Sequence, residues 1–109
     1  MPPAVIVSGT FRATHGLGPE VRVAMALMMA ASRAEDGCEA YSYAQDIEDP
    51  KLVRVFEVWR DRAAFEAHRQ APHLREWRAR WPQLGLGDAR LEVVTVAARD
   101  PVAPPVLQA

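Results

Sequence analysis

A strand pattern that leads directly into a helix pattern constrains the fold of this chain most strongly. Residues 52–59 are rich in β-branched and aromatic side chains and have the length of a single strand. Neither of their alternating faces is fully polar, which predicts a strand covered on both sides of its sheet. Asp61 is a favourable N-cap for the helix that follows. On that helix Ala64, Phe65 and His68 share one stripe, so His68 is expected to face the sheet.

The other hydrophobic patterns complete a βαββαβ order of elements. The expected strands cover residues 4–12, 39–46, 52–59 and 89–98, and the expected helices cover residues 19–35 and 62–81, the second with an interruption at Pro72. This order predicts an α+β, ferredoxin-like fold, in which a four-stranded antiparallel sheet carries both helices on one face. The opposite face would expose apolar residues such as Phe56 and Val58. We therefore expect a homodimer in which two such faces pack together.

Length and composition indicate one ordinary globular domain. The chain has 109 residues, enough to bury a core, and we place the domain at residues 1–100, followed by a Pro-rich tail at residues 101–109. A net charge of -1 gives no electrostatic basis for binding nucleic acid or a membrane surface. No apolar run reaches the ~18 residues of a membrane span. The single cysteine cannot form an internal disulfide and no signal-peptide pattern is present, so a cytoplasmic location is expected.

Three motifs, in this order and spacing, resemble the antibiotic biosynthesis monooxygenase (ABM) family. They are an acidic-Gly turn before a Tyr-bearing strand at residues 32–41, a Glu-x-Trp strand end at residues 56–61, and a helix with one His followed by a Pro-His pair at residues 63–68 and 72–73. The resemblance covers residues 4–98 and implies a dimeric α/β barrel with a ligand cavity between sheet and helices. Many relatives oxygenate quinols or polycyclic phenols with O2 and no metal, flavin or haem. Others act on signalling molecules by proton transfer, and many have no known activity.

The chemistry of individual side chains can be considered alongside this resemblance. A cofactor-free oxygenase needs a base, a dry pocket and groups that hold a flat ring, because a deprotonated quinol or phenol donates electrons to O2 more readily. His68, with a reference pKa of about 6.5, suits the role of general base, and Glu57 is expected to orient its imidazole or share its proton. The remaining candidates bind the substrate: Trp59, Tyr43 and Phe65 as ring walls, Tyr41 or Arg33 as donors to an oxyanion, and His73 beside the helix break.

Each candidate also has a purely structural interpretation. An inward His on an apolar stripe is often a core histidine, and Trp59 can fill the core at the end of its strand. Glu57 can form an ion pair with Arg33 or Arg54, and His73 can pack at the helix break. Tyr41 and Tyr43 are good strand formers in any case.

Metal binding is not expected from the sequence. His68 and His73 are five positions apart with a proline between them, which is not the i, i+4 spacing of a helical zinc pair, and no third ligand lies near them in sequence. Haem degradation is disfavoured too, because the haem-degrading relatives use an Asn on the first strand and residues 4–12 contain none.

The sequence therefore predicts a cofactor-independent monooxygenase that acts on a quinol or polycyclic phenol with O2. Two alternatives stay open: a non-catalytic small-ligand-binding or stress protein of the same fold, and a proton-transfer isomerase of a small signalling molecule. The polarity of the cavity discriminates among them. The enzyme needs His68 beside a void with a polar neighbour, whereas a carrier needs only apolar walls.

Overall fold

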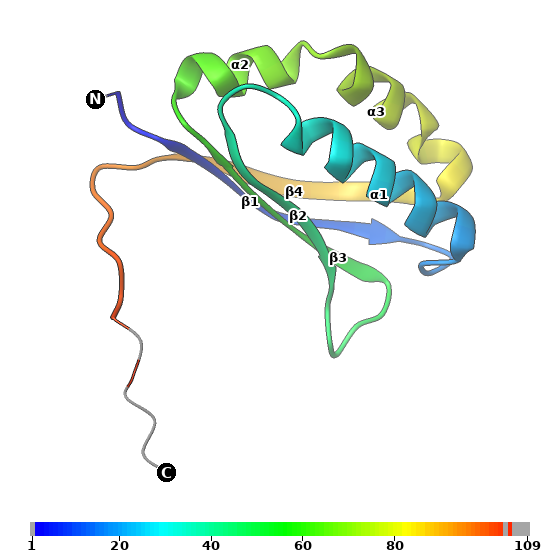
Figure 1. Ribbon diagram of the computed structural model, residues 1–109. Helices are drawn as coiled ribbons and strands as arrows, with labels where there is room; N and C mark the ends of the chain where they lie inside the picture. The colour runs from blue at the N-terminus through cyan, green and yellow to red at the C-terminus, as the bar shows by residue number, and fades with distance from the viewer. Residues whose placement is uncertain (1, 104, 106–109) are drawn as a thin grey trace.

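The elements follow one another as predicted, except that the second helical region forms two separate helices (Figure 1). The structure, a computed structural model, describes residues 2–103 and 105. Its elements are β1 (Val5–Ala13), α1 (Pro19–Arg33), β2 (Cys38–Gln45), β3 (Leu52–Trp59), α2 (Arg62–Arg69), α3 (Pro72–Leu84) and β4 (Leu86–Thr95). The four strands form one antiparallel sheet in the order β2-β3-β1-β4, and all three helices lie on the same face of it (Figure 1). The ferredoxin-like α+β fold is confirmed.

The two faces of the central strand β3 differ sharply. Val53, Val55, Glu57 and Trp59 alternate along β3 and are all buried beneath the helices. On the other face Phe56 is 45% exposed as expected, whereas Val58, which was also expected to be exposed, is only 8% exposed because Ile6 and Ala40 flank it on the neighbouring strands. The second cover predicted for β3 does not come from the single chain. The covering helices all lie on one side, and the outer face is left to solvent or to a second copy. The homodimer stays a prediction.

Local signals fix the ends of the helices above the sheet. Asp61 caps α2 as expected, because its carboxylate accepts a hydrogen bond of 2.9 Å from the backbone N–H of Ala64. Pro72 occupies the first turn of α3, where its missing N–H leaves no helical bond unmade. The break between α2 and α3 therefore lies where the proline predicts, and it places His68 near the end of one helix and His73 at the start of the next.

The end of α3 differs from the prediction. The helix continues past Pro82 to Leu84, and β4 then begins at Leu86 and ends at Thr95, whereas the sequence predicted a strand at residues 89–98. Pro82 has no N–H to bond the carbonyl of Arg78, so α3 loses one hydrogen bond there, but only two residues of helix follow. Gly85 ends the helix with a φ of 71°, a left-handed conformation that favours glycine. The strand starts early because Leu86 already pairs with β1.

Edge strand β4 is left partly uncovered by the helices. Leu91 and Val93 pair with Gly9 and Val7, so they lie on the helix-facing side of the sheet, yet Val93 remains 45% exposed. The helices thus leave an opening above β4. Residues 101–103 follow without regular structure, and residues 104 and 106–109 of the expected tail lie outside the described residues. Within the described part of the chain, no helix has the length and apolar character needed to cross a membrane.

Candidate active site

A cavity of about 320 Å³ lies between the helix-facing side of the sheet and helices α2 and α3. This volume is at the small end of the range for ligand pockets. Its walls are mostly aromatic and aliphatic, with four polar or charged side chains among them: Glu57, His68, Arg69 and Arg78. The aromatic members of the wall are Phe11, Tyr41, Tyr43, Phe65, Trp77 and Trp81. The cavity therefore suits a small, flat ligand that carries a few polar groups.

His68 lies in the wall of this cavity, and its ring packs on the indole of Trp59. Its side chain is only 3% exposed, and its ring stacks on that of Trp59 with centroids 4.5 Å apart and an interplanar angle of 29°. Tyr41 contacts the imidazole edge-on at 5.4 Å. Trp59 is itself fully buried and lies outside the cavity lining. The expected role of Trp59 as a ring wall is therefore wrong: alternation placed it on the correct face, but it lies beneath His68.

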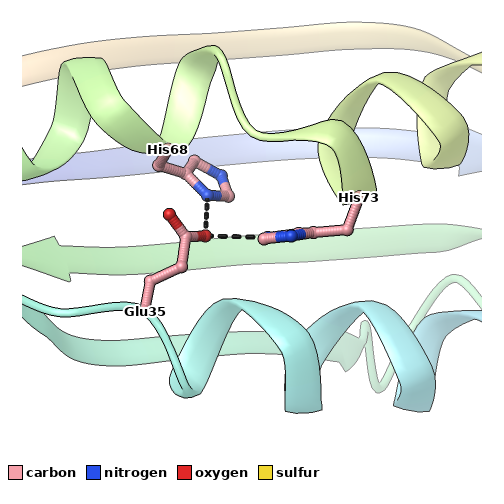
Figure 2. A group of neighbouring side chains, drawn as sticks. All are labelled: Glu35, His68 and His73. Carbon is pink, nitrogen blue, oxygen red and sulfur yellow. Dashed lines mark hydrogen bonds and ion pairs between the residues drawn. The ribbon is translucent and has the colours of Figure 1, made fainter.

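A carboxylate that the sequence analysis did not select holds the imidazole in place. Figure 2 shows Glu35, from the turn after α1, reaching between His68 and His73. One oxygen, Glu35 Oε2, lies 2.6 Å from His68 Nδ1 and 2.8 Å from His73 Nε2. An ionised carboxylate only accepts hydrogen bonds, so both imidazole nitrogens donate to it. His68 is thereby fixed with its proton on Nδ1, and Nε2 is left unprotonated.

Glu57 approaches the other side of the imidazole without bonding to it. Glu57 Oε1 is 3.9 Å from His68 Nε2, which is too long for a hydrogen bond, and accepts a bond of 2.9 Å from Trp59 Nε1. Burial raises the pKa of Glu57 to about 6, although the bond from Trp59 opposes this rise. Burial also lowers the pKa of His68, and Glu35 partly offsets that effect. At neutral pH His68 is therefore a neutral base beside an ionisable carboxyl group.

The two tyrosines of β2 form a hydroxyl pair in the cavity wall. Their hydroxyl oxygens are 2.7 Å apart, and the Tyr43 ring stacks on Trp77 with centroids 6.0 Å apart. Burial raises the pKa of Tyr43 to about 12 and moves the pKa of Tyr41 upward as well. Both groups remain protonated at neutral pH. They offer one hydroxyl proton beyond the one they share, so the pair can donate a hydrogen bond to a ligand.

The structure brings together some of the sequence-predicted residues and separates others. Those that line the cavity are His68, Glu57, Tyr41, Tyr43 and Phe65. Trp59, Arg33 and His73 lie outside the lining. Arg33 donates instead to the backbone oxygen of Tyr41 at 2.8 Å, and Arg54 pairs with Asp46, so neither arginine forms the suggested ion pair with Glu57. His73 shares the Glu35 carboxylate with His68, and its ring lies 6.0 Å from that of His68.

Helix α3 supplies cavity residues that the sequence analysis did not assign to the site. Leu74, Trp77, Arg78 and Trp81 follow the i, i+3, i+4, i+7 spacing of one helix face, and all four line the cavity. The spacing was readable from the sequence. What it could not show was that this face borders a void instead of packed core.

Glu35, His68 and His73 are also the residues that could hold a metal ion. Their ligand atoms lie within 4.8 Å of one another, and two imidazoles with one carboxylate are a common ligand set for divalent transition metals. No third ligand lies near the two histidines in sequence, but Glu35 reaches them in the fold from a distant turn. Within the group, one oxygen of Glu35 is hydrogen-bonded to one nitrogen of each imidazole. The absence of a metal stays a prediction.

Comparison with known proteins agrees with these observations. The family model described as "Antibiotic biosynthesis monooxygenase" matches residues 4–80. "Putative monooxygenase Rv0793" of Mycobacterium tuberculosis is 37% identical over 78 residues, which are 72% of this chain and 73% of that protein. "Uncharacterized protein sll1783" of Synechocystis is 29% identical over 93 residues, 85% of this chain. The match spans 63% of the Synechocystis protein, less than two thirds of its length.

Solved structures show the same fold. A Deinococcus radiodurans crystal structure described with the same family name superposes with a TM-score of 0.83 at 22% identity, covering 92% of this chain and 99% of that one. PA3566 of Pseudomonas aeruginosa is 30% identical, with a TM-score of 0.70 and coverage of 90% and 97%. The family model covers most of the chain, and the matched residues include the Glu35 turn, β3, α2 and the greater part of α3. The chain belongs to the antibiotic biosynthesis monooxygenase family.

Proposed function

We propose that this protein is a cofactor-independent monooxygenase that oxidises a small quinol or polycyclic phenol with O2. The family and the name of its mycobacterial relative support monooxygenase chemistry in general terms. One observation gives the strongest support to base-assisted oxidation of a quinol or phenol. His68 lines the cavity while Glu35 accepts the hydrogen bond from its Nδ1–H, so that Nε2 is free to accept a proton. A buried neutral imidazole of this kind is a suitable general base near neutral pH.

The proposed reaction needs no external reductant. His68 Nε2 removes the proton of a substrate hydroxyl, and the resulting anion donates electrons to O2. One oxygen atom then becomes bonded to the substrate as a peroxide, and cleavage of the O–O bond releases the other as water, with His68 returning its proton. A quinol and O2 give a hydroxyquinone and water, which balances in atoms and electrons. All four electrons that reduce O2 come from the substrate.

The walls of the cavity suit this chemistry. Phe65 and Trp77 provide flat apolar surfaces that hold an aromatic ring and exclude water. The Tyr41–Tyr43 hydroxyl pair can donate a hydrogen bond to the oxyanion that forms when the substrate loses its proton. Because burial raises the pKa of both tyrosines, they stay protonated over the pH range in which His68 is a base.

We also propose that the working unit is a homodimer formed through the outer face of the sheet. Phe56 and Val94 are 45% and 40% exposed on this face, and Ile6 pairs with Val94 on one side and with Val58 on the other. Exposed apolar residues grouped on one sheet face favour a second copy as the partner. Light scattering on the purified protein tests this proposal directly.

The test of the proposed activity is oxygen consumption with a panel of quinols and polycyclic phenols, without added cofactor. We expect uptake by the wild type and its loss in His68→Ala, with circular dichroism unchanged. His15→Ala, which removes a histidine outside the cavity, is the matched control. Equal rates in wild type and His68→Ala would remove His68 from the mechanism. Tight binding without uptake would favour a carrier.

A second candidate is a proton-transfer isomerase. The observation that favours it is the pairing of His68 with Glu57, whose pKa is raised to about 6 and whose carboxyl oxygen lies 3.9 Å from the imidazole. A neutral imidazole and a carboxyl group of raised pKa that lie side by side can remove a proton from one carbon and return it to another. Solvent deuterium incorporation into a ligand without oxygen uptake would support the isomerase over the oxygenase.

A further inference from the structure

Arg78 is the one charged residue on the cavity face of α3. Its neighbours on that face, Leu74, Trp77 and Trp81, are apolar or aromatic, and this stripe extends for about 10 Å along the helix, given a rise of 1.5 Å per residue. An arginine is usually found on the solvent face of an amphipathic helix. Arg78 is exposed as well as part of the cavity lining, so it lies at the rim of the cavity, where its guanidinium is open to solvent and to a ligand.

The contacts of Arg78 within the described residues leave its positive charge available. Among residues 2–103 and 105, none of the ion pairs includes Arg78, and its guanidinium instead lies 4.5 Å from the centre of the Trp81 ring. The other cavity arginine, Arg69, is paired with Glu66 at 3.4 Å. The positive charge of Arg78 lowers the pKa of Glu57 and of Tyr43, so its charge acts on the interior of the cavity. It is a cation available to a ligand.

The neighbouring Trp81 presents a second unused group. Its ring lines the cavity and is 92% buried, but within the described part of the chain its Nε1–H has no hydrogen-bond acceptor. A buried N–H without an acceptor is uncommon in native proteins, since it loses its hydrogen bond to water and gains nothing in return. This N–H is closed to solvent, so the indole must turn before a ligand oxygen bound beside the Arg78 guanidinium can accept a hydrogen bond from it.

We infer that Arg78 and Trp81 form an anion subsite, and that the substrate is an aromatic hydroxyl compound bearing a carboxylate. The inference rests on the proposed function for the hydroxyl that faces His68. A planar guanidinium matches a carboxylate with two parallel hydrogen bonds, which favours this group over a single charged atom. His68 and Arg78 line the same cavity, so one ligand can place its hydroxyl beside the first and its carboxylate beside the second.

The experiment compares two probes that differ only in the anionic group. These are 1,4-naphthoquinol and 1,4-dihydroxy-2-naphthoate, titrated into the full-length protein under anaerobic conditions so that no turnover occurs. We expect the carboxylated probe to bind the wild type about tenfold more tightly, as one charge-assisted contact at the rim of a cavity provides. In Arg78→Gln the ratio of the two affinities falls close to one.

Arg80→Gln is the matched control. Arg80 lies on the same helix two positions further on, is exposed, and is outside the cavity lining, so its replacement removes the same charge without touching the subsite. We expect the ratio of affinities to stay at its wild-type value. Equal affinities of the two probes for the wild type, or equal losses in both variants, would overturn the anion subsite.

The indole N–H is tested separately by nuclear magnetic resonance. The chain has three tryptophans, so ¹⁵N-tryptophan labelling gives three indole signals, and Trp81→Phe identifies that of Trp81. We expect the carboxylated probe to move the Trp81 signal downfield more than the neutral probe does; equal shifts with both would remove Trp81 from the subsite. These binding results do not depend on turnover. A protein that prefers the carboxylated probe but consumes no oxygen would contradict only the oxygenase proposal.

Discussion

Replacing Glu35 with glutamine keeps the size of the side chain but removes the negative charge that His68 and His73 share. Two hydrogen bonds, of 2.6 and 2.8 Å, then change from charge-assisted to neutral. Each weakens by about 1 kcal/mol, so we expect Glu35→Gln to lower the free energy of unfolding by about 2 kcal/mol. The glutamine can also turn its NH2 group toward His68, which would favour the wrong imidazole tautomer.

The catalytic effect of this change is expected to be larger than its effect on stability. With its proton no longer fixed on Nδ1, His68 loses the free Nε2 that removes the substrate proton. A correctly placed general base contributes about 10²–10⁴-fold to rate, so we expect kcat to fall by about 100-fold or more. Oxygen uptake with a saturating quinol measures the rate, and urea unfolding of the same variant measures the stability.

The pH profile separates a positioning role from simple structural damage. Burial lowers the pKa of His68, His73 and Arg78 lower it further, and Glu35 alone among these groups raises it. Because His68 must be neutral to act as a base, the rate rises with pH through this pKa. Removing Glu35 therefore moves the acid limb of the profile to lower pH. An unchanged limb, or one that moves to higher pH, would refute the assignment.

Asp36→Asn is the matched control for this prediction. Asp36 is the next residue along the chain and is also acidic, but its carboxylate pairs with Arg60 on the surface at 3.3 Å. Surface pairs of this kind contribute little to stability. We expect Asp36→Asn to keep the wild-type rate and the wild-type pH profile. A loss as large as that of Glu35→Gln would show that the turn as a whole is responsible.

Three further predictions follow from single contacts. Burial raises the pKa of Glu57 from 4.5 to about 6, so its stabilising contribution is present below pH 4.5 and is lost as the pH rises through 6. Glu57→Gln, which cannot ionise, is expected to raise the free energy of unfolding in mildly alkaline buffer by about 2 kcal/mol, and urea unfolding that showed no gain would contradict this. Phe56→Asp is expected to convert the proposed dimer to monomer in light scattering, because it puts a charge on the exposed apolar sheet face; an unchanged mass would show that this face is not the interface. Gly9→Ala is expected to cost about 1–3 kcal/mol, because its Cβ would lie 2.0 Å from a backbone oxygen of β4, whereas Gly87→Ala meets no atom within 4 Å and serves as its control in thermal unfolding.

The sequence predicted the part of this fold that depends on local pattern. Alternation along residues 52–59 separated the buried face of β3 from the exposed one, and the stripe of α2 turned His68 toward the sheet. Asp61 and Pro72 marked helix starts because their effects are confined to one turn. Pro82 was misleading because the loss of one hydrogen bond did not stop α3, which continues for two more residues and ends at Gly85.

Local patterns could not predict how deeply a side chain is buried, or which residues far apart in the sequence meet in the fold. Alternation placed Trp59 and Glu57 on one face, but it could not show that Trp59 lies beneath His68 and outside the cavity. Glu35 contacts residues 33 and 38 positions away, and it reaches them only because the end of α1, the end of α2 and the start of α3 meet above the sheet. A contact of that kind depends on the packing of three elements, which no local spacing records.

The site places two carboxylates beside one imidazole and gives them different tasks through geometry. Glu35 bonds directly to Nδ1 of His68 and fixes its tautomer, whereas Glu57 remains 3.9 Å from Nε2 and is held instead by Trp59. If Glu57 bonded to Nε2, the lone pair that must face the substrate would be replaced by a proton. The indole N–H therefore does more than fill the core, because it draws Glu57 away from the imidazole. This separation leaves His68 free to act as a base while a second ionisable group, with a pKa of about 6, lies beside it.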